Sequence, residues 1–329
     1  MPTLRVLSRA DLQAALDMPA AITAVRQAFA QLALGEAQVP LRSALNFAPD
    51  AVALVMPAYL AASGGLGLKV VTVTPANSAR GLPLIHALVV VLDAETGAPI
   101  AALEGGWLTA LRTGAASGAA TDMLARHDAE TLAVFGAGAQ GETQALAACA
   151  VRQIRRVRLY DKTPGKAEAL AARLAGLPGI PSDVAVAPDP ASAVADADIV
   201  CTATTSPTPV FPGDILRPGT HVNAVGAFTL TARELDEAVV ARARIVVDER
   251  NAAIAEAGDL VIPWQAGEAV GPEEWTELGA IAAGLEPGRQ HADEITLFKS
   301  VGNAVQDVAV AALAVARAAD RSLGTLVPL

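Results

Sequence analysis

Residues 131–150, TLAVFGAGAQGETQALAACA, decide the fold of this chain. A short apolar run at 131–135 leads into three glycines, Gly136, Gly138 and Gly141, and an alanine-rich stretch follows. The pattern predicts a buried strand, a tight turn and a helix. In such a turn Gly136 permits the bend, Gly138 lets the backbone approach a pyrophosphate, and Gly141 lets the helix pack closely on the strand. The free N–H groups at the start of the helix favour an anionic ligand.

An acidic residue follows this turn at the distance that a dinucleotide site requires. The next strand-like run, 157–161, ends in Asp161, where a carboxylate would bind the hydroxyl groups of the adenine ribose. Because a carboxylate repels a 2′-phosphate, Asp161 favours NAD(H), while the neighbouring Lys162 leaves NADP(H) possible. The alternative interpretation is a glycine turn in an α/β protein that binds no nucleotide.

Outward from this motif, strands and helices alternate through the second half of the chain. Strand-like runs recur at 183–187, 198–204, 221–226 and 244–248, with helical segments after the first strands. Such alternation is typical of parallel βαβ units, so we predict a Rossmann-type, doubly wound parallel sheet of the α/β class. We place this dinucleotide-binding domain at residues 116–299.

Residues 1–115 show a different pattern of predicted strands and helices. A strand at 3–7 and two helical segments precede strand-like runs at 42–48, 51–60 and 66–74, and a hairpin covers 87–105. Consecutive strands without intervening helices predict a mostly antiparallel α+β domain. A last apolar helix, expected to begin near Ser300, either returns to this domain or forms an oligomer interface, so residues 300–329 are assigned to it.

Composition excludes several classes of protein. A net charge of −10 over 329 residues disfavours nucleic-acid binding, which needs a basic face. The two cysteines, Cys149 and Cys201, make neither a disulfide framework nor a metal-binding spacing. We find no signal peptide and no apolar run long enough for a membrane span. The sequence therefore predicts a cytoplasmic protein without a metal site, a membrane segment or a nucleic-acid partner.

Three cations of the first domain lie in unusual surroundings. Lys69 interrupts the apolar run GLGLKVVTV, Arg42 lies in VPLRSALNF, and Arg112 lies near the expected start of a small-residue helix, where its charge opposes the helix dipole. A buried, unpaired ammonium is costly, and an anionic ligand would remove that cost. The three residues together would suit a small carboxylic acid. The alternative for Lys69 is a snorkelling edge residue, and for Arg42 a surface residue.

Two histidines, His86 and His221, are candidates for a chemical role. His86, within PLIHALVV, could supply a proton, although a lone histidine on an apolar strand is more often a core residue. His221 opens a strand and is interpreted as structural. The acidic pair Asp196 and Asp198 is interpreted as a turn cluster without chemistry.

The chain resembles the ornithine cyclodeaminase/mu-crystallin family over nearly its whole length. The matching segments include GLGLKVVTVTPAN, LDAETGAPIAALEGGWLTALRTGAAS, LAVFGAGAQGETQALA, GTHVNAVGAFTLTARELD and ITLFKSVGNAVQDVAVA. The resemblance implies a homodimer whose first domain binds substrate and whose second domain binds a nicotinamide cofactor. It implies that Arg42, Lys69 and Arg112 hold the substrate, with Lys69 catalytic, and that residues 293–297 close the pocket. For the cofactor it implies contacts by Arg112, Thr113, Gly136, Gly138, Ala139, Gln140, Gly141, Asp161, Lys162, Thr202, Ala224, Val225 and Gly226.

One position departs from the cyclodeaminase pattern. Those enzymes carry an acid after the Val-Gly-Ala turn, where this chain has Phe228. Phenylalanine cannot accept a proton, so the resemblance favours the branch that reduces cyclic imines, Δ1-pyrroline-2-carboxylate and Δ1-piperideine-2-carboxylate, to L-proline and L-pipecolate. In that reading Phe228 forms an apolar wall for the substrate ring. The alternatives are ornithine cyclodeamination, an alanine dehydrogenase reaction, and mu-crystallin-like ligand binding without turnover.

Overall fold

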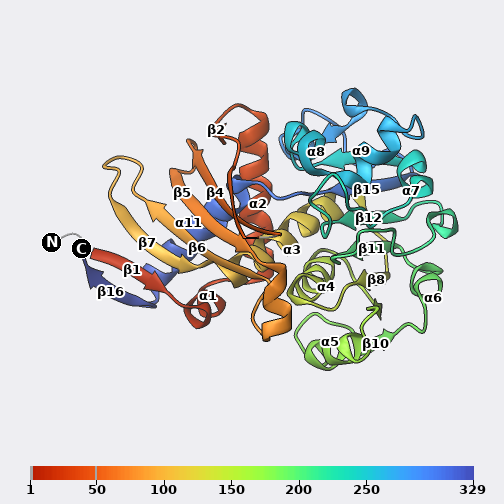
Figure 1. Ribbon diagram of the computed structural model, residues 1–329, viewed down its shortest axis with the longest axis horizontal. Coiled ribbons are helices and arrows are strands. Elements are labelled where there is room, and N and C mark those ends of the chain that lie inside the picture. The colour runs from red at the N-terminus through yellow and green to blue at the C-terminus, as the bar shows by residue number, and fades with distance from the viewer. Residues whose placement is uncertain (1–2, 49) are drawn as a thin grey trace. The chain divides into compact units, whose positions relative to one another are not determined.

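The computed structural model describes residues 3–48 and 50–329 (Figure 1). The chain divides into two compact units, Met1–Arg112 with Asn303–Leu329, and Thr113–Gly302. The boundaries predicted from the sequence, 115/116 and 299/300, differ from these by three residues each. Within the described residues, no helix is long and apolar enough to cross a bilayer.

The first unit is built on one mostly antiparallel sheet. Its strands follow the order β16–β1–β7–β6–β5–β4–β2, with β3 paired to β4, and only the β1–β7 pair is parallel. The strands are β1 (Thr3–Leu7), β2 (Ala37–Gln38), β3 (Ser43–Ala48), β4 (Ala51–Leu60), β5 (Gly65–Val73), β6 (Ile85–Leu92), β7 (Pro99–Glu104) and β16 (Thr325–Pro328). Strand β16 was not foreseen from the sequence.

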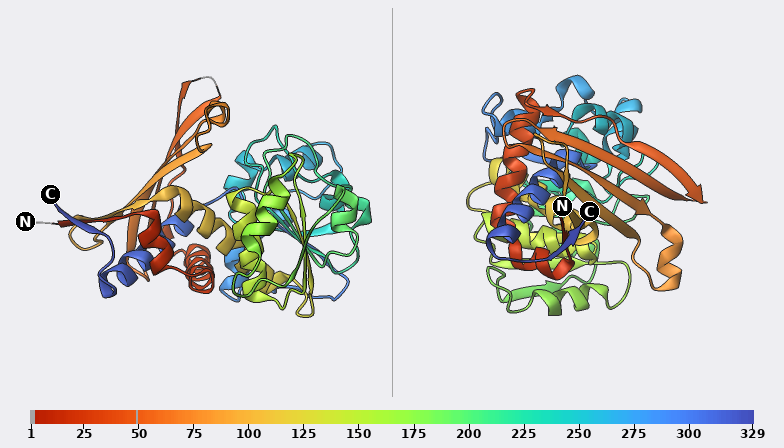
Figure 2. Two further views of the ribbon diagram at one scale, coloured as in Figure 1. Left: turned by 90° about the horizontal axis from the view of Figure 1, so that it is seen from below. Right: turned by 90° about the vertical axis from the view of Figure 1, so that its left-hand side faces the viewer.

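Helices α1 (Arg9–Ala15), α2 (Met18–Ala33) and α11 (Ala304–Asp320) cover one face of this sheet (Figure 2). Helix α11 packs on α2 and on β4, β5 and β6. It begins at Ala304 rather than near Ser300, because the side chain of Asn303 caps the helix in a reciprocal pair with Gln306. The C-terminal helix therefore completes the core of the first unit.

The two faces of strand β5 differ in burial. Lys69 lies opposite Met56 and Val89 on the neighbouring strands, and all three side chains are buried. Gly67 shares their face, and a Cβ there would lie 3.5 Å from Val308 of α11. Because successive side chains alternate between faces, Val70 points the other way and is exposed. Lys69 therefore faces α11 and the core.

The second unit contains a parallel sheet with helices on both sides (Figure 2). The strand order is β10–β9–β8–β11–β12–β15–β13–β14. The strands are β8 (Thr131–Phe135), β9 (Arg156–Tyr160), β10 (Asp183–Val186), β11 (Ile199–Thr202), β12 (His221–Ala224), β13 (Ala243–Val247), β14 (Thr276–Glu277) and β15 (Ile295–Lys299). The helices are α4 (Ala139–Val151), α5 (Lys166–Leu174), α6 (Pro190–Val194), α7 (Glu237–Arg242), α8 (Arg250–Glu256), α9 (Gly258–Gln265) and α10 (Leu278–Ala282). The expected doubly wound α/β fold is confirmed.

Strand β15 corrects one expectation about the site. Thr296 pairs with His221 at the start of β12, whereas Lys299 pairs with Ala224 at its end. In a parallel sheet, ligands bind beyond the carboxyl ends of the strands. Residues 293–297 therefore lie toward the opposite, amino end of the sheet, and the expectation that they close the ligand pocket is wrong.

Candidate functional site

Two cations of the first unit share one buried carboxylate. The Lys69 ammonium lies 2.7 Å from Asp307 Oδ2, and Arg112 Nε donates to Asp307 Oδ1 at 3.0 Å. Arg112 also donates through Nη1 to Gln306 Oε1. Lys69 is 1% exposed and Asp307 is fully buried. We call Lys69, Arg112, Gln306 and Asp307 the cation cluster.

The surroundings of Lys69 bring its pKa close to neutral pH. Burial and then the positive charge of Arg112 lower the pKa of Lys69, while Asp307 opposes both effects, and the resulting pKa is about 8. The charge of Arg42 also lowers this pKa. Arg42 is half-buried and precedes β3 rather than lying within a strand. The three predicted cations are thus brought together, with Arg42 acting on Lys69 through its charge.

The structure corrects two parts of the argument for these cations. Lys69 is not left unpaired for a ligand to neutralise, because Asp307 supplies a counter-charge from α11. Arg112 is not near a helix N-terminus, because α3 (Gly105–Leu124) begins seven positions before it. The argument from the helix dipole therefore does not apply, and the burial of Arg112 is explained by its bonds to Asp307 and Gln306.

The two histidines lie apart from the cation cluster. His86 pairs with Thr72, so it projects from the face of the sheet opposite Lys69, and it is exposed. It is neither a core residue nor a member of the cluster. His221 is buried, with its ring nitrogens near Thr296 Oγ1 and Asn223 Oδ1, and burial lowers its pKa to about 3. His221 is therefore a neutral structural residue.

The glycine turn of the second unit fits a pyrophosphate. Gly136 has φ +95°, a conformation that favours glycine, and a Cβ on Gly141 would lie 1.9 Å from the carbonyl oxygen of Gly136. Nothing lies within 4 Å of a Cβ at Gly138, which caps α4 without a side-chain hydrogen bond. The backbone is thus open where a phosphate would approach, and the helix N-terminus presents its N–H groups there. Ala139 and Gln140 form its first turn.

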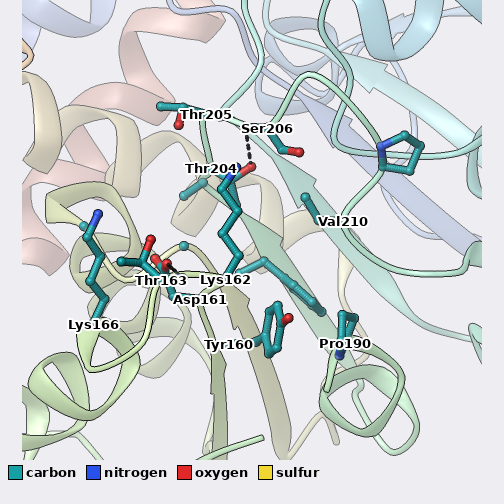
Figure 3. Close-up of a pocket in the computed structure, with 15 residues that line it drawn as sticks. Tyr160, Asp161, Lys162, Thr163, Lys166, Pro190, Thr204, Thr205, Ser206 and Val210 are labelled. Atoms are coloured by element: carbon teal, nitrogen blue, oxygen red, sulfur yellow. Dashed lines mark hydrogen bonds between the residues drawn. The ribbon is translucent and has the colours of Figure 1, made fainter. Parts of the chain in front are cut away.

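A cavity of about 320 Å³ adjoins this turn (Figure 3). Its lining includes Gly136, Gly138, Asp161 and Lys162 together with residues 203–206. Asp161 accepts hydrogen bonds from the N–H groups of Ala137 and Thr163, both at 2.8 Å. Burial opposes its ionisation, yet these bonds and the charge of Lys166 hold the pKa of Asp161 below its usual value. A charged carboxylate beside the turn suits ribose hydroxyl groups.

Other expected cofactor residues are buried or half-buried. Thr202 and Ala224 are fully buried strand residues, and the Thr202 hydroxyl donates to Glu234. The N–H of Gly226 also donates to Glu234, while Val225 and Phe228 are half-buried in the loop after β12. Thr113 is buried in α3. As cofactor contacts, Thr113, Thr202 and residues 224–226 stay predictions, and Phe228 stays a prediction as a substrate contact.

Sequence reasoning missed Asp307, Gln306 and Glu234. Asp307 lies in the first turn of α11, where an acid is ordinarily explained by the helix dipole. The sequence did contain a sign that Asp307 is buried, because this acid interrupts the apolar face of the helix. Glu234 stands in a polar loop segment, TARELD, whose composition does not indicate full burial.

Comparisons with known proteins cover almost the entire chain. The model of the ornithine cyclodeaminase/mu-crystallin family matches residues 3–322. A Delta(1)-pyrroline-2-carboxylate reductase of Bacillus cereus is 43% identical over 287 residues, 87% of either chain. The structure of the Thermococcus litoralis Delta(1)-pyrroline-2-carboxylate reductase, in complex with NADH and L-proline, is 40% identical, with a TM-score of 0.94 over 98% of this chain and 99% of that one. An archaeal alanine dehydrogenase, described as a dimer with bound NAD, is 33% identical, with a TM-score of 0.91 over 99% of each chain.

The match of a family model over nearly all of the sequence, joined to these relatives, settles the family. The chain belongs to the ornithine cyclodeaminase/mu-crystallin family.

Proposed function

We propose that this protein reduces a cyclic α-imino acid, Δ1-pyrroline-2-carboxylate or Δ1-piperideine-2-carboxylate, to L-proline or L-pipecolate. NADH is the favoured reductant and NADPH the alternative. The observation that carries the proposal is the buried cation cluster, in which two cations share one carboxylate and leave a net positive charge for an anionic substrate. The likeness to pyrroline-2-carboxylate reductases supports the same reaction.

The cluster suggests a role for each cation. The guanidinium of Arg112 has more donors than its bonds to Asp307 and Gln306 use, so it can bind the substrate carboxylate with Arg42. Lys69 would hold that carboxylate or the proton that the imine nitrogen takes up. A bound nicotinamide would supply the hydride. The turn at Gly136–Gly141 and the carboxylate of Asp161 would hold the rest of the cofactor.

Phe228 favours reduction over deamination. Loss of ammonia from ornithine needs a group that accepts a proton or binds the substrate ammonium, and phenylalanine does neither. Its ring packs against the core of the second unit and remains half-buried. We propose that it forms an apolar wall for the carbons of the substrate ring.

The direct test is an initial-rate assay with the purified protein. Both cyclic imines are offered with NADH and with NADPH, and the loss of absorbance of the reduced cofactor is followed. Oxidation of NADH or NADPH with either imine supports the proposal. If neither imine causes oxidation of either cofactor, the proposal is wrong. Parallel reactions of ornithine with NAD+, and of pyruvate with ammonia and NADH, test the two other reactions. Tight ligand binding without any turnover would favour a mu-crystallin-like role.

The pKa of Lys69 predicts a basic limb in the pH profile. Only the charged ammonium attracts a carboxylate or donates a proton. Near pH 8, half of the Lys69 side chains have lost that proton. We expect kcat/KM to fall above about pH 8 in the wild type. The limb should move to higher pH in Lys69→Arg, since arginine stays charged throughout this range. An identical limb in both proteins would assign it to the substrate and contradict the prediction.

We also propose a homodimer formed by the exposed face of the first sheet. Val55, Val70 and Leu88 lie in one row across β4, β5 and β6, and each is exposed. The archaeal relative is described as a dimer, and we propose that a second copy of this chain covers this apolar row. Light scattering should give about twice the mass of one chain, 33.3 kDa, and Val70→Lys should halve it. A monomeric wild type would contradict this proposal.

We propose that the protein works in the cytoplasm. Both of its cysteines are free thiols, Cys149 half-buried and Cys201 buried. Free thiols are typical of a reducing compartment. The reductants named above are also metabolites of that compartment.

A further inference from the structure

A buried carboxylate joins two loops at the carboxyl edge of the second sheet. Glu234 Oε1 accepts from Thr204 N at 2.6 Å and from Thr204 Oγ1 at 2.8 Å. Its Oε2 accepts from Thr202 Oγ1 at 2.9 Å and from the N–H groups of Gly226 and Ala227 at 2.7 and 3.3 Å. One side chain thus binds both the segment that follows β11 and the segment that follows β12.

Two further buried charges support Glu234. Asp259 Oδ1 accepts from the N–H groups of Glu234 and Leu235, and its Oδ2 lies 2.7 Å from the ammonium of Lys299. Lys299 also donates to the carbonyl oxygen of Ala227 at 2.6 Å. Ala227 is therefore held at its N–H by Glu234 and at its carbonyl by Lys299, immediately before Phe228. We call Glu234, Asp259 and Lys299 the loop brace.

The backbone held by the loop brace is closely packed. A Cβ on Gly226 would lie 2.3 Å from the carbonyl oxygen of Thr204 and 2.5 Å from Glu234 Oε1. Burial raises the pKa of Glu234, as does the charge of Asp259, and Lys299 opposes both. Three fully buried ionisable groups are a costly way to stabilise a core, because an apolar cluster would avoid their desolvation. The arrangement is better explained by the fixed geometry that it gives to the loops.

The loop after β12 lies toward the half of the dinucleotide site away from the adenine side. The order of the strands reverses between β8 and β11, and a dinucleotide lies across such a point. Asp161 follows β9, which lies on one side of β8. The ribose of the adenine half would bind at this carboxylate. The loop after β12 lies on the other side of β8, where the nicotinamide half would bind, and residues 203–206 after β11 reach back to line the cavity beside Asp161.

We infer that Glu234 is a positioning residue for the nicotinamide half of the cofactor site. With Asp259 and Lys299 behind it, it fixes the loops after β11 and β12 and orients the backbone that carries Phe228. This inference rests on the proposed function, since it assumes that a dinucleotide binds. It assigns the brace no direct contact with cofactor or substrate.

The test compares two ligands that differ in the nicotinamide. Glu234→Gln keeps the size of the side chain but turns an NH2 group toward donors that need an acceptor, so one loop should be released. We expect the Kd for NADH to rise at least about tenfold, and the Kd for ADP-ribose, which lacks nicotinamide, to rise by a clearly smaller factor, since Thr204 also lines the cavity beside Asp161. Calorimetry measures both without turnover. Thr202→Val removes one hydroxyl donor from Glu234. It should also raise the Kd for NADH more than the Kd for ADP-ribose, but by a smaller factor than Glu234→Gln.

Glu249→Gln is the matched control. Glu249 accepts backbone N–H bonds at the start of α8, away from both loops, so neither Kd should change. If the two Kd values rise together in Glu234→Gln and Thr202→Val, or if neither rises, the inference is wrong. A wild type that binds neither NADH nor ADP-ribose would contradict the proposed function itself. If Glu234→Gln does not fold, Thr202→Val decides the question alone.

Discussion

Replacing Lys69 by methionine should reduce kcat/KM for Δ1-pyrroline-2-carboxylate by at least about a hundredfold, the usual scale for losing one partner of a buried charge pair. The variant removes the ammonium but nearly keeps the volume of the side chain, so strand β5 can pack as before. Asp307 retains its bond from Arg112 Nε at 3.0 Å, so no carboxylate is left without a partner. The loss should therefore report the missing charge rather than a disturbed core.

Cofactor binding provides the internal control for Lys69→Met. The glycine turn and Asp161 belong to the second compact unit, whereas Lys69 belongs to the first. The Kd for NADH should accordingly stay within about twofold of the wild-type value, a change of less than half a kcal/mol. A variant that binds NADH normally and retains more than about a fifth of the wild-type kcat/KM, a loss of only about 1 kcal/mol, would contradict a central role for Lys69.

The sequence identified Lys69 but not the residue that explains it. A lysine inside an apolar strand is visible locally, because strand periodicity predicts burial at that position. Its partner Asp307 is 238 residues away in the chain, and only the return of α11 to the first unit brings the two together. No local pattern specifies such a pairing. The same limit hid Asp259, whose partner Lys299 lies at the end of the buried strand β15.

The fold was predictable to the extent that its signals are local. The glycine turn and the alternation after it predicted the parallel sheet, and the uninterrupted strands before residue 105 predicted the antiparallel one. Strands β2, β14 and β16 were missed because they have only two to four residues, and β15 was missed although it is as long as β8. The missed position of β15 matters for function, since it led to the error about residues 293–297.

Two of the four lysines are buried, one in each unit, and each lies 2.7 Å from an aspartate. Their surroundings separate their roles. Lys299 donates to a backbone carbonyl, which suits a structural brace. Lys69 instead has two guanidinium groups acting on it, and their charges with burial bring its pKa to about 8. A lysine can lose its proton in this range and an arginine cannot, which gives a reason for lysine at position 69.

Replacing Asp307 by asparagine should destabilise the protein and shift its pH profile. The change leaves Lys69 and Arg112 buried without their counter-charge, and breaking a buried pair in this way costs about 3–5 kcal/mol. Denaturant titration should show that loss at neutral pH. Asp307 raises the pKa of Lys69, so its removal should bring that pKa below about 8 and move the basic limb of kcat/KM to lower pH.

Asp17→Asn is the matched control for this prediction, since Asp17 also pairs with a residue of α11. Its Oδ2 lies 2.9 Å from Arg317 Nη1, but the Asp17 side chain is 59% exposed, so its removal should cost no more than about 1 kcal/mol. The sign of the pH dependence gives a second check on Asp307→Asn. The folded variant would release the Lys69 proton below pH 8, whereas the unfolded chain keeps it to about 10.5, so stability should rise with pH between these values. A variant as stable as Asp17→Asn, with an unmoved basic limb, would show that Asp307 does not control Lys69.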